Sequence, residues 1–322
     1  MTILDEKEKI KKLIESSEHI YIMAHKYLDL DAIGSAIGMY EFIKEYDKKT
    51  TIIIDDRSKE AGVKKIIDKM GDLYRIRRAS KIKSKITDND LLIVVDTNKD
   101  TLLQNESILP MFKNVMVIDH HDLTEKSINK GLVIIDEDSS STCEMVADLL
   151  DAEKISFDED VATILLAGIV LDTNNYVLKT TANTYRISYI LATKGADPTY
   201  VQYLLKQDMK SYIARQKVIT NVKIVKNIAI TAAKSNVKYK REELAKIADT
   251  LLQFHNIEAS FVIGKLDDNT VGISARSQGK INVGKILENF NGGGDNHEAG
   301  ARFETKRLKD VEDKLKNILK NI

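Results

Sequence analysis

The sequence has few of the features that mark several large classes of protein. It contains one cysteine, Cys143, which excludes an internal disulfide framework and fits a reducing compartment. No stretch approaches the ~20 apolar residues that a membrane span needs. Residues 1–7 lack the apolar core of a signal peptide. These absences lead us to expect a cytoplasmic protein with no membrane segment in this chain.

The chain also lacks net charge and has only two prolines. Lys plus Arg and Asp plus Glu both number 49, so no broad basic field is available to bind long nucleic acid. The neutral net charge does not exclude small anionic substrates. A hydrophobic content of 43% and a charged content of 30% predict a packed, ordered chain rather than a disordered one. The length of 322 residues predicts two domains.

Short apolar runs alternate with longer helical patterns in the first part of the chain. This alternation predicts an α/β fold with a doubly wound parallel sheet and right-handed crossovers. Asp31 is well placed to cap the helix that follows it, and Ser141 and Glu144 form a capping-box pattern. The expected strands are 20–24, 51–54, 91–95, 115–118 and 132–135, and the main expected helices are 6–16, 32–46, 59–70, 161–171, 184–194 and 200–206.

The pattern changes near residue 210, where strands no longer alternate regularly with helices. We therefore expect a catalytic domain over 1–210, including a helical linker, and a smaller α+β domain over 211–322. The glycine run Gly292-Gly293-Gly294 is expected to be a loop. The second domain should contain strands 222–225, 228–232, 259–265, 270–276 and 301–303, with helices 242–254, 282–290 and 308–319.

Metal-capable side chains follow three of the apolar runs and one apolar helix. In an open parallel sheet, ligands bind outside the carboxyl ends of the strands, so these side chains should share one edge. A single acid at a strand end is usually a loop acid or a helix cap, and a lone His25 would more often be a hydrogen-bonded neutral residue. The recurrence of such side chains at several strand ends, with two adjacent histidines at one of them, favours a metal site. The residues are His25, Asp29, Asp31, Asp96, Asp119, His120, His121 and Asp172.

So many carboxylates at one edge would resist joint ionisation, and divalent cations would relieve their repulsion. A mixture of carboxylate and imidazole suits Mn²⁺, Fe²⁺, Co²⁺ or Zn²⁺ better than Ca²⁺. Two metals ~3.5–4 Å apart are a common device for phosphoryl hydrolysis. The pattern therefore indicates phosphoryl chemistry as one use of such an edge.

The second domain offers groups that could bind a phosphate. Backbone amides of the glycine run could approach an anion, Arg276 could pair with it, and His297 could donate to it. The alternatives are a flexible connector and a surface arginine. If the first interpretation holds, this domain binds the substrate that the first domain cleaves.

Several motifs resemble those of the DHH phosphoesterases, in the order that this family has. His25–Asp31 resembles the first motif, 95–98 the second, Asp119-His120-His121 the signature, and 167–173 the fourth. Residues 272–277 and the glycine run are similar to motifs of the DHH-associated C-terminal domain. The segments 94–99, 165–173 and 195–197 resemble, within the family, the catalytic module of the GdpP-type cyclic di-AMP phosphodiesterases.

This resemblance implies two Mn²⁺ ions, with Co²⁺, Fe²⁺ or Mg²⁺ as alternatives, and hydrolysis of cyclic di-AMP to linear pApA by a hydroxide that the two metals activate. His25 and Asp29 would hold one metal, with Asp96 bridging to the other. The second metal's own ligands would be Asp31, His120 and Asp172. Asp119 would orient a histidine, and His121 would lie at the substrate phosphate. The nucleotide would be bound by Arg276, Ser277, Gly292, Gly293, Gly294 and His297.

The glycine motif departs from the family pattern, because Asp295 and Asn296 separate its three glycines from His297. This departure keeps open a nanoRNase or pAp phosphatase that acts on linear dinucleotides such as pApA or pGpG. A binding module that has lost catalysis ranks lower because no motif ligand is missing, and a long-strand exonuclease lower still. GdpP-type proteins carry further domains, so we expect either part of a longer membrane-attached protein or a stand-alone relative. A homodimer remains open.

Overall fold

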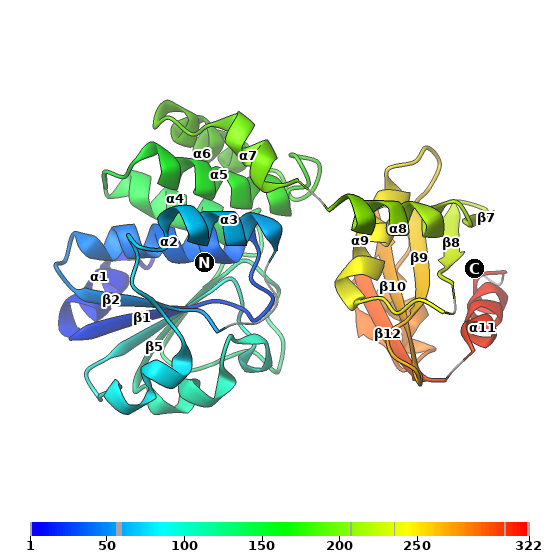
Figure 1. Cartoon of the computed structure of the whole chain (residues 1–322), viewed down its shortest axis with the longest axis horizontal. Coiled ribbons are helices and arrows are strands. Elements are labelled where there is room, and N and C mark those ends of the chain that lie inside the picture. The colour runs from blue at the N-terminus through cyan, green and yellow to red at the C-terminus, as the bar shows by residue number, and fades with distance from the viewer. Residues whose placement is uncertain (1, 56–59, 207, 235, 306, 321–322) are drawn as a thin grey trace. The chain divides into compact units, whose positions relative to one another are not determined.

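The computed structural model describes residues 2–55, 60–206, 208–234, 236–305 and 307–320. Its contacts divide the chain into two compact units, Met1–Lys206 and Gln207–Ile322 (Figure 1). Each unit has its own six-stranded sheet and is described separately. Among the helices of the described residues, none has both the length and the apolar character needed to cross a membrane.

The first unit is built on a parallel sheet with the order β3-β2-β1-β4-β5-β6. The predicted parallel α/β sheet is thus confirmed. β1 lies between β2 and β4, so the strand order reverses between β1 and β4, which is where α/β sheets bind ligands. The sequence prediction missed β3, whose two residues are too short for a periodic pattern. The strands are β1 His19–Met23, β2 Lys49–Ile53, β3 Ile76–Arg77, β4 Leu91–Val95, β5 Asn114–Asp119 and β6 Leu132–Ile135.

Helices cover one face of this sheet, and short 3₁₀ turns with loops cover the other (Figure 1). Alternate strand residues point to opposite faces: Ile93 packs under the helices, whereas Val94 packs with Phe112 on the other face. The expected helix 59–70 is observed from Ala61, and residue 59 lies outside the described residues. The helices are α1 Lys7–Ser16, α2 Leu30–Lys44, α3 Ala61–Met70, α4 Thr142–Ala152, α5 Glu159–Asp172, α6 Ala182–Thr193 and α7 Pro198–Leu204.

Helices α2, α4 and α5 pack very closely around one buried thiol. A Cβ at Gly34 of α2 would lie 2.6 Å from the Sγ of Cys143, and a Cβ at Gly168 of α5 would lie 2.5 Å from the same atom. Both distances are too short for real atoms, so only glycine fits at these positions. This close approach lets α2 and α5 bring their polar ends to the same edge of the sheet.

The second unit has a mixed sheet with the order β11-β12-β10-β9-β8-β7, in which only β8 and β9 are parallel. Helices α8 and α9 pack on one face, and α10 and α11 on the other. The elements are α8 Met209–Ile219, β7 Lys223–Val225, β8 Ile228–Ala232, α9 Arg241–Leu252, β9 Ala259–Lys265, β10 Thr270–Ser277, α10 Val283–Glu288, β11 Gly293–Gly294, β12 Glu298–Glu304 and α11 Leu308–Lys320.

The expectation that the glycine run is a loop was wrong for Gly293 and Gly294. These two residues form β11, which pairs with Gly300 and Ala299 of β12. The preceding Gly292 lies against the same strand, where a Cβ would be 2.5 Å from the Gly300 carbonyl oxygen. The absence of side chains at Gly292 and Gly294 therefore lets the segment lie close against β12.

Gly34→Ala should destabilise the first unit, although alanine favours a helix by about 1 kcal/mol over glycine. The added methyl must displace the Cys143 Sγ atom, and such overpacking costs roughly 1–3 kcal/mol. Because the next nearest atom is 3.2 Å away, Cys143→Ala should partly restore the stability of the Gly34→Ala variant. Urea unfolding of the two single variants and the double variant measures this coupling. Additive effects of the two substitutions would contradict the packing account.

Candidate metal centre

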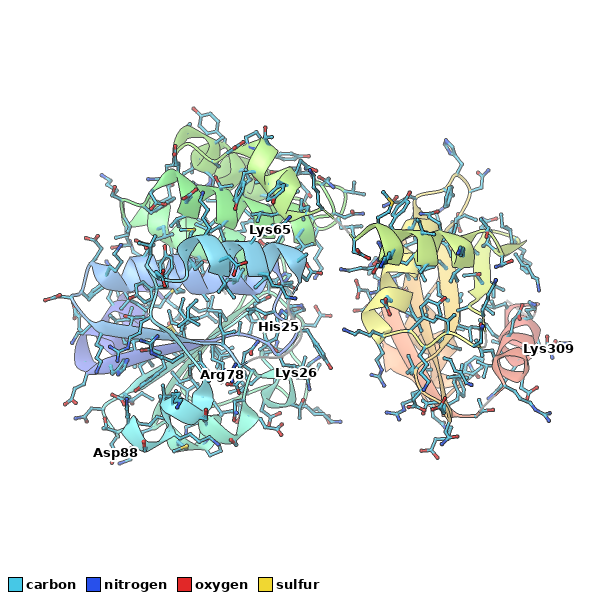
Figure 2. The ribbon with its side chains drawn as sticks, in the orientation of Figure 1. His25, Lys26, Lys65, Arg78, Asp88 and Lys309 are labelled. Carbon is cyan, nitrogen blue, oxygen red and sulfur yellow. The ribbon has the colours of Figure 1, made fainter. Side chains whose placement is uncertain are left out.

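Eight polar side chains meet at the carboxyl edge of the first sheet, around the point where the strand order reverses. His25 follows β1, Asp96 follows β4, and Asp119 ends β5. Figure 2 shows His25 and its neighbour Lys26 at this edge of the first unit. The described residues contain three groups that could hold a metal ion, and their members are the eight residues expected from the sequence: His25, Asp29, Asp31, Asp96, Asp119, His120, His121 and Asp172.

The first group joins the end of β1 to the start of α2. The Nε2 atom of His25 lies 3.1 Å from Asp96 Oδ2 and 3.4 Å from Asp29 Oδ2. Asp29 also caps α2, because its Oδ1 accepts a hydrogen bond from the Ala32 amide at 3.0 Å. The expectation that Asp31 is this cap was wrong. Asp31 lies within the first turn of the helix and points elsewhere.

The second group contains Asp31, Asp96, His120 and Asp172. His120 Nε2 lies 3.1 Å from Asp172 Oδ2 and 3.7 Å from Asp96 Oδ1. Asp96 thus uses one carboxylate oxygen toward His25 and the other toward His120. It is the carboxylate that the first two groups share.

Asp31 is held in place by the N-terminus of α4. Its two carboxylate oxygens accept hydrogen bonds from the Thr142 amide at 2.8 Å and the Cys143 amide at 2.7 Å. An anion at a helix N-terminus satisfies otherwise free amides and lies in a favourable helix dipole. The sequence predicts the start of this helix at Ser141, but the hydrogen bonds to Asp31 depend on the tertiary structure.

Asp96 has a left-handed backbone conformation, with φ of 58°. This conformation costs most residues about 1–2 kcal/mol but is tolerated by Asp and Asn. The Asp96 amide donates to Ile118 O at 3.0 Å, and Thr142 Oγ1 donates to Asp96 Oδ1 at 3.3 Å. Thr142 is therefore a site residue that the sequence analysis missed, because a threonine at a helix start normally signals a cap.

The end of α5 is fixed by an unusual turn directly after Asp172. Asn174, Asn175 and Tyr176 have φ values of 47°, 59° and 63°. Thr173 holds this turn: its Oγ1 accepts from the Tyr176 amide at 2.9 Å, and its carbonyl accepts from the amides of Val177 and Leu178 at 2.8 Å. The turn stops the helix at Asp172 and so sets where this carboxylate lies.

The two adjacent histidines have different surroundings. The side chain of His120 is 5% exposed, whereas that of His121 is 54% exposed. His121 Nδ1 lies 2.7 Å from Asp119 Oδ1, which also accepts from the His120 amide at 2.9 Å. Asp119 therefore orients the exposed imidazole rather than the buried one.

Burial and crowding change the protonation of the carboxylates. Burial, followed by the charge of Asp172, raises the pKa of Asp31 to about 6. Burial, followed by the charge of Asp29, raises the pKa of Asp172 to about 8, and burial with the charge of Asp31 holds the pKa of Asp96 well above its usual range. Without a cation, Asp31, Asp96 and Asp172 therefore hold their protons to a higher pH than ordinary carboxyl groups do.

The pKa values of the three imidazoles are also shifted, and not all in the same direction. Burial, followed by the charge of His121, lowers the pKa of His120 to about 4. For His121, burial opposes protonation, but the hydrogen bond to Asp119 and the charges of Asp119, Asp96 and Asp172 together outweigh it and raise the pKa to about 9. Burial also opposes protonation of His25, but the charges and hydrogen bonds of Asp29 and Asp96 together outweigh it and hold the pKa of His25 well above its usual range. His120 is thus a neutral ring, the form that can ligate a metal.

The donor set fits divalent cations. Both ring nitrogens of His120 and the Oδ2 atom of Asp119 are buried and make no hydrogen bond to any residue that the structure describes. Unpartnered buried polar atoms are costly and call for an explanation. A cation beside His120 Nε2 would supply a partner and would relieve the repulsion among Asp31, Asp96 and Asp172.

The structure pairs Arg276 internally. Its Nε donates to Asp249 Oδ1 at 2.8 Å, its Nη2 lies 3.3 Å from Glu298 Oε2, and its Nη1 donates to Ala275 O at 3.1 Å. Two carboxylates therefore compete with any phosphate for this guanidinium.

His297 and Ser277 lie together beside the turn that joins β11 to β12. His297 Nδ1 is 3.3 Å from Ser277 O, and Ser277 Oγ accepts from the Gly279 amide at 3.0 Å. Asp295, the residue that departs from the family motif, accepts from the amides of His297 and Glu298 at 2.6 and 2.8 Å. The additional acid stabilises this turn.

The metal-free protein should lose stability as the pH rises from 6.5 to 8. In this range the folded state keeps protons on Asp172, with a pKa of about 8, and on His121, with a pKa of about 9, which the unfolded state releases. Below pH 6.5 the lowered pKa of His120 acts in the opposite direction. Urea unfolding in EDTA tests this dependence, which Asp172→Asn should weaken. Stability that rises over this range would contradict the charge arrangement.

The chain is similar in sequence to several known proteins. The chain is 36% identical over 320 residues to the cyclic-di-AMP phosphodiesterase GdpP of Geobacillus thermodenitrificans, covering 96% of this chain and 48% of that protein. It is 26% identical over 332 residues to the bifunctional oligoribonuclease and PAP phosphatase NrnA of Mycoplasma genitalium, covering 96% and 95%. The chain spans about half the length of the cyclic-di-AMP phosphodiesterases it matches.

The fold is also similar to that of a solved structure. An exopolyphosphatase-related protein from Bacteroides fragilis matches with a TM-score of 0.78 and 21% identity, covering 98% of this chain and 96% of that one. The family model of the DHH family N-terminal domain matches residues 19–169, and that of the DHHA1 domain matches residues 218–321. The chain therefore belongs to the DHH family and contains a DHH domain followed by a DHHA1 domain.

Proposed function

We propose that the chain is a metal-dependent phosphodiesterase that opens cyclic di-AMP to linear pApA, with two Mn²⁺ ions as its cofactors. The observation that carries the proposal is the position of Asp96, whose two carboxylate oxygens face two separate groups of metal donors. The substrate class comes from the relatives named as cyclic-di-AMP phosphodiesterases.

Each donor group would hold one ion. His25 and Asp29 would bind the first, and Asp31, His120 and Asp172 the second, with Asp96 shared between them. Two divalent ions held here would supply a hydroxide nucleophile at neutral pH and positive charge that offsets the charge growing on the phosphate. The amides of Thr142 and Cys143 fix the orientation of Asp31, and the turn after α5 fixes Asp172.

His121 would contact the substrate rather than a metal. Its raised pKa of about 9 makes the ring cationic at neutral pH, and its side chain is the exposed one of the pair. Asp119 holds Nδ1, so the Nε2–H is left to donate to a phosphate oxygen. This donor would bind the scissile phosphate and stabilise its developing charge.

A nanoRNase or pAp phosphatase is the second candidate. It is supported by the similarity to NrnA, a relative named as a bifunctional oligoribonuclease and PAP phosphatase. Linear dinucleotides such as pApA or pGpG would then be the substrates.

In Mn²⁺, the chain should convert cyclic di-AMP and stop at pApA. Cyclic di-AMP, cyclic di-GMP, pApA, pGpG and pAp are compared at equal concentration, with products separated by chromatography. Faster cleavage of the linear dinucleotides to mononucleotides would replace the first candidate with the second.

Asp96→Asn should remove both bound metal and activity while leaving the fold intact. Asparagine tolerates the left-handed backbone of this position but cannot share charge between two cations. Asp47→Asn is the matched control, because Asp47 also has a positive φ, of 53°, but lies outside the metal-capable groups of the described residues. Metal content by mass spectrometry and turnover of cyclic di-AMP are measured together. Retained activity in Asp96→Asn would overturn the shared-ligand role.

A further inference from the structure

Glu144, in the first turn of α4, is a buried carboxylate that belongs to none of the metal-capable groups. The residue is 1% exposed. Its Oε2 accepts from the Ser140 amide at 3.2 Å, from the Ser140 hydroxyl, and from Thr184 Oγ1 at 2.8 Å. Its Oε1 accepts from Asn183 Nδ2 at 2.9 Å. One buried carboxylate thus joins the segment before α4 to the first turn of α6.

These contacts differ from the capping box that the sequence predicts. Half of the box is present, because Ser141 Oγ accepts from the Glu144 amide at 3.0 Å. The Glu144 carboxylate, however, accepts from Ser140 and not from the Ser141 amide that a capping box would use. The carboxylate is therefore free to reach α6 as well, which packs beside α4 (Figure 1).

The start of α4 holds two of the expected metal ligands. Two amides in its first turn donate to the carboxylate of Asp31, and Thr142 Oγ1 donates to Asp96 Oδ1 at 3.3 Å. Ser140 directly precedes this turn, and its two hydrogen bonds to Glu144 fix the entry of the chain into the helix. Glu144 therefore determines where the donors to Asp31 and Asp96 lie.

Helix α6 carries the turn that follows the third ligand, Asp172. In that turn Tyr176 Oη donates to Ser188 Oγ of α6 at 3.0 Å. Ser188 Oγ in turn donates to the Thr184 carbonyl at 2.8 Å, and Thr184 Oγ1 is one of the donors to Glu144. The contacts of Glu144 thus extend through α6 to the turn that ends α5 at Asp172.

We propose that Glu144 is a positioning residue for the second of the two ions. Through the start of α4 it orients Asp31 and Asp96, and through α6 it holds the turn after Asp172. Glu144 itself would contact neither an ion nor the substrate. The inference rests on the two-metal centre of the proposed function and adds to it a residue that ligates nothing.

The effect should be selective for the second ion. Asp96 faces His25, in the first donor group, through its Oδ2 atom. The oxygen that accepts from Thr142 is Oδ1, which faces His120 in the second group. Loss of the contacts of Glu144 should therefore disturb the second donor group more than the first.

Glu144→Gln tests the role with little change in side-chain size. It places an N–H₂ group where all four described partners of the carboxylate are donors, so at least one hydrogen bond is lost. The affinity for the second Mn²⁺ should fall roughly 10- to 100-fold, the usual effect of losing a group that orients metal ligands. Calorimetric titration of the metal-free whole chain with Mn²⁺ measures both affinities, and Asp31→Asn identifies the step that belongs to the second ion.

A second variant and a rescue keep the test independent of how well Glu144→Gln folds. Thr184→Val removes one donor to Glu144 and should weaken the second Mn²⁺ in the same direction but less. Asn183→Asp, added to Glu144→Gln, supplies an acceptor for the new amide and should recover part of the lost affinity. Mn²⁺ affinities that are unchanged in both Glu144→Gln and Thr184→Val would overturn the positioning role.

Asp148→Asn is the matched control on the same helix. Asp148 accepts from Asn183 Nδ2 at 3.3 Å and from Arg186 Nη2 at 2.6 Å, so it also joins α4 to α6, but it lies one turn beyond the start of α4. Asp148→Asn and Glu144→Gln should both lower stability to urea in EDTA, whereas only Glu144→Gln should weaken Mn²⁺. An equal loss of Mn²⁺ affinity in Asp148→Asn would reduce Glu144 to a purely structural role.

Turnover at rising Mn²⁺ separates this inference from the proposed function. Glu144→Gln should need roughly 10- to 100-fold more Mn²⁺ for half-maximal turnover of cyclic di-AMP and should approach the wild-type kcat at saturation. Binding of two ions that depends on Glu144, without turnover of cyclic di-AMP, would refute the proposed substrate and support the positioning role. Turnover with the same Mn²⁺ dependence in wild type and Glu144→Gln would do the reverse. A wild-type protein that binds a single ion would overturn both.

Discussion

Mutual repulsion among buried carboxylates is the constraint on which the first unit depends. Asp31, Asp96 and Asp172 lie within reach of one another beside His120, and their pKa values are raised because burial makes each charge costly. The chain offsets part of this cost with its own groups, above all the two amides of α4 that hold Asp31. The remaining cost is what a pair of divalent cations would remove.

The architecture places these groups together by close packing. Glycines at positions 34 and 168 bring α2 and α5 onto the thiol of Cys143, and the same thiol belongs to the first turn of α4. The end of α5, the start of α4 and the start of α2 therefore reach one edge, where the order of the parallel strands reverses. Packing in the core and chemistry at the edge are thus linked through a few residues.

The sequence predicted the parallel sheet and the members of the metal-capable edge, because apolar runs that end in Asp or His are visible without tertiary information. It could not predict that Thr142 donates to Asp96 or that Asp29 rather than Asp31 caps α2, since both depend on where separate elements meet. The internal pairing of Arg276 was missed for the same reason. The pairing of β11 with β12 was missed because a glycine run carries no periodic pattern.

The most direct test of the account is a crystal structure of the protein grown with Mn²⁺, with anomalous diffraction recorded at the manganese edge. The account predicts two anomalous peaks, one beside His25 and Asp29 and one beside Asp31, His120 and Asp172, with Asp96 bound to both. A single peak, or peaks that do not contact Asp96, would contradict the central claim that this edge is a shared two-metal centre.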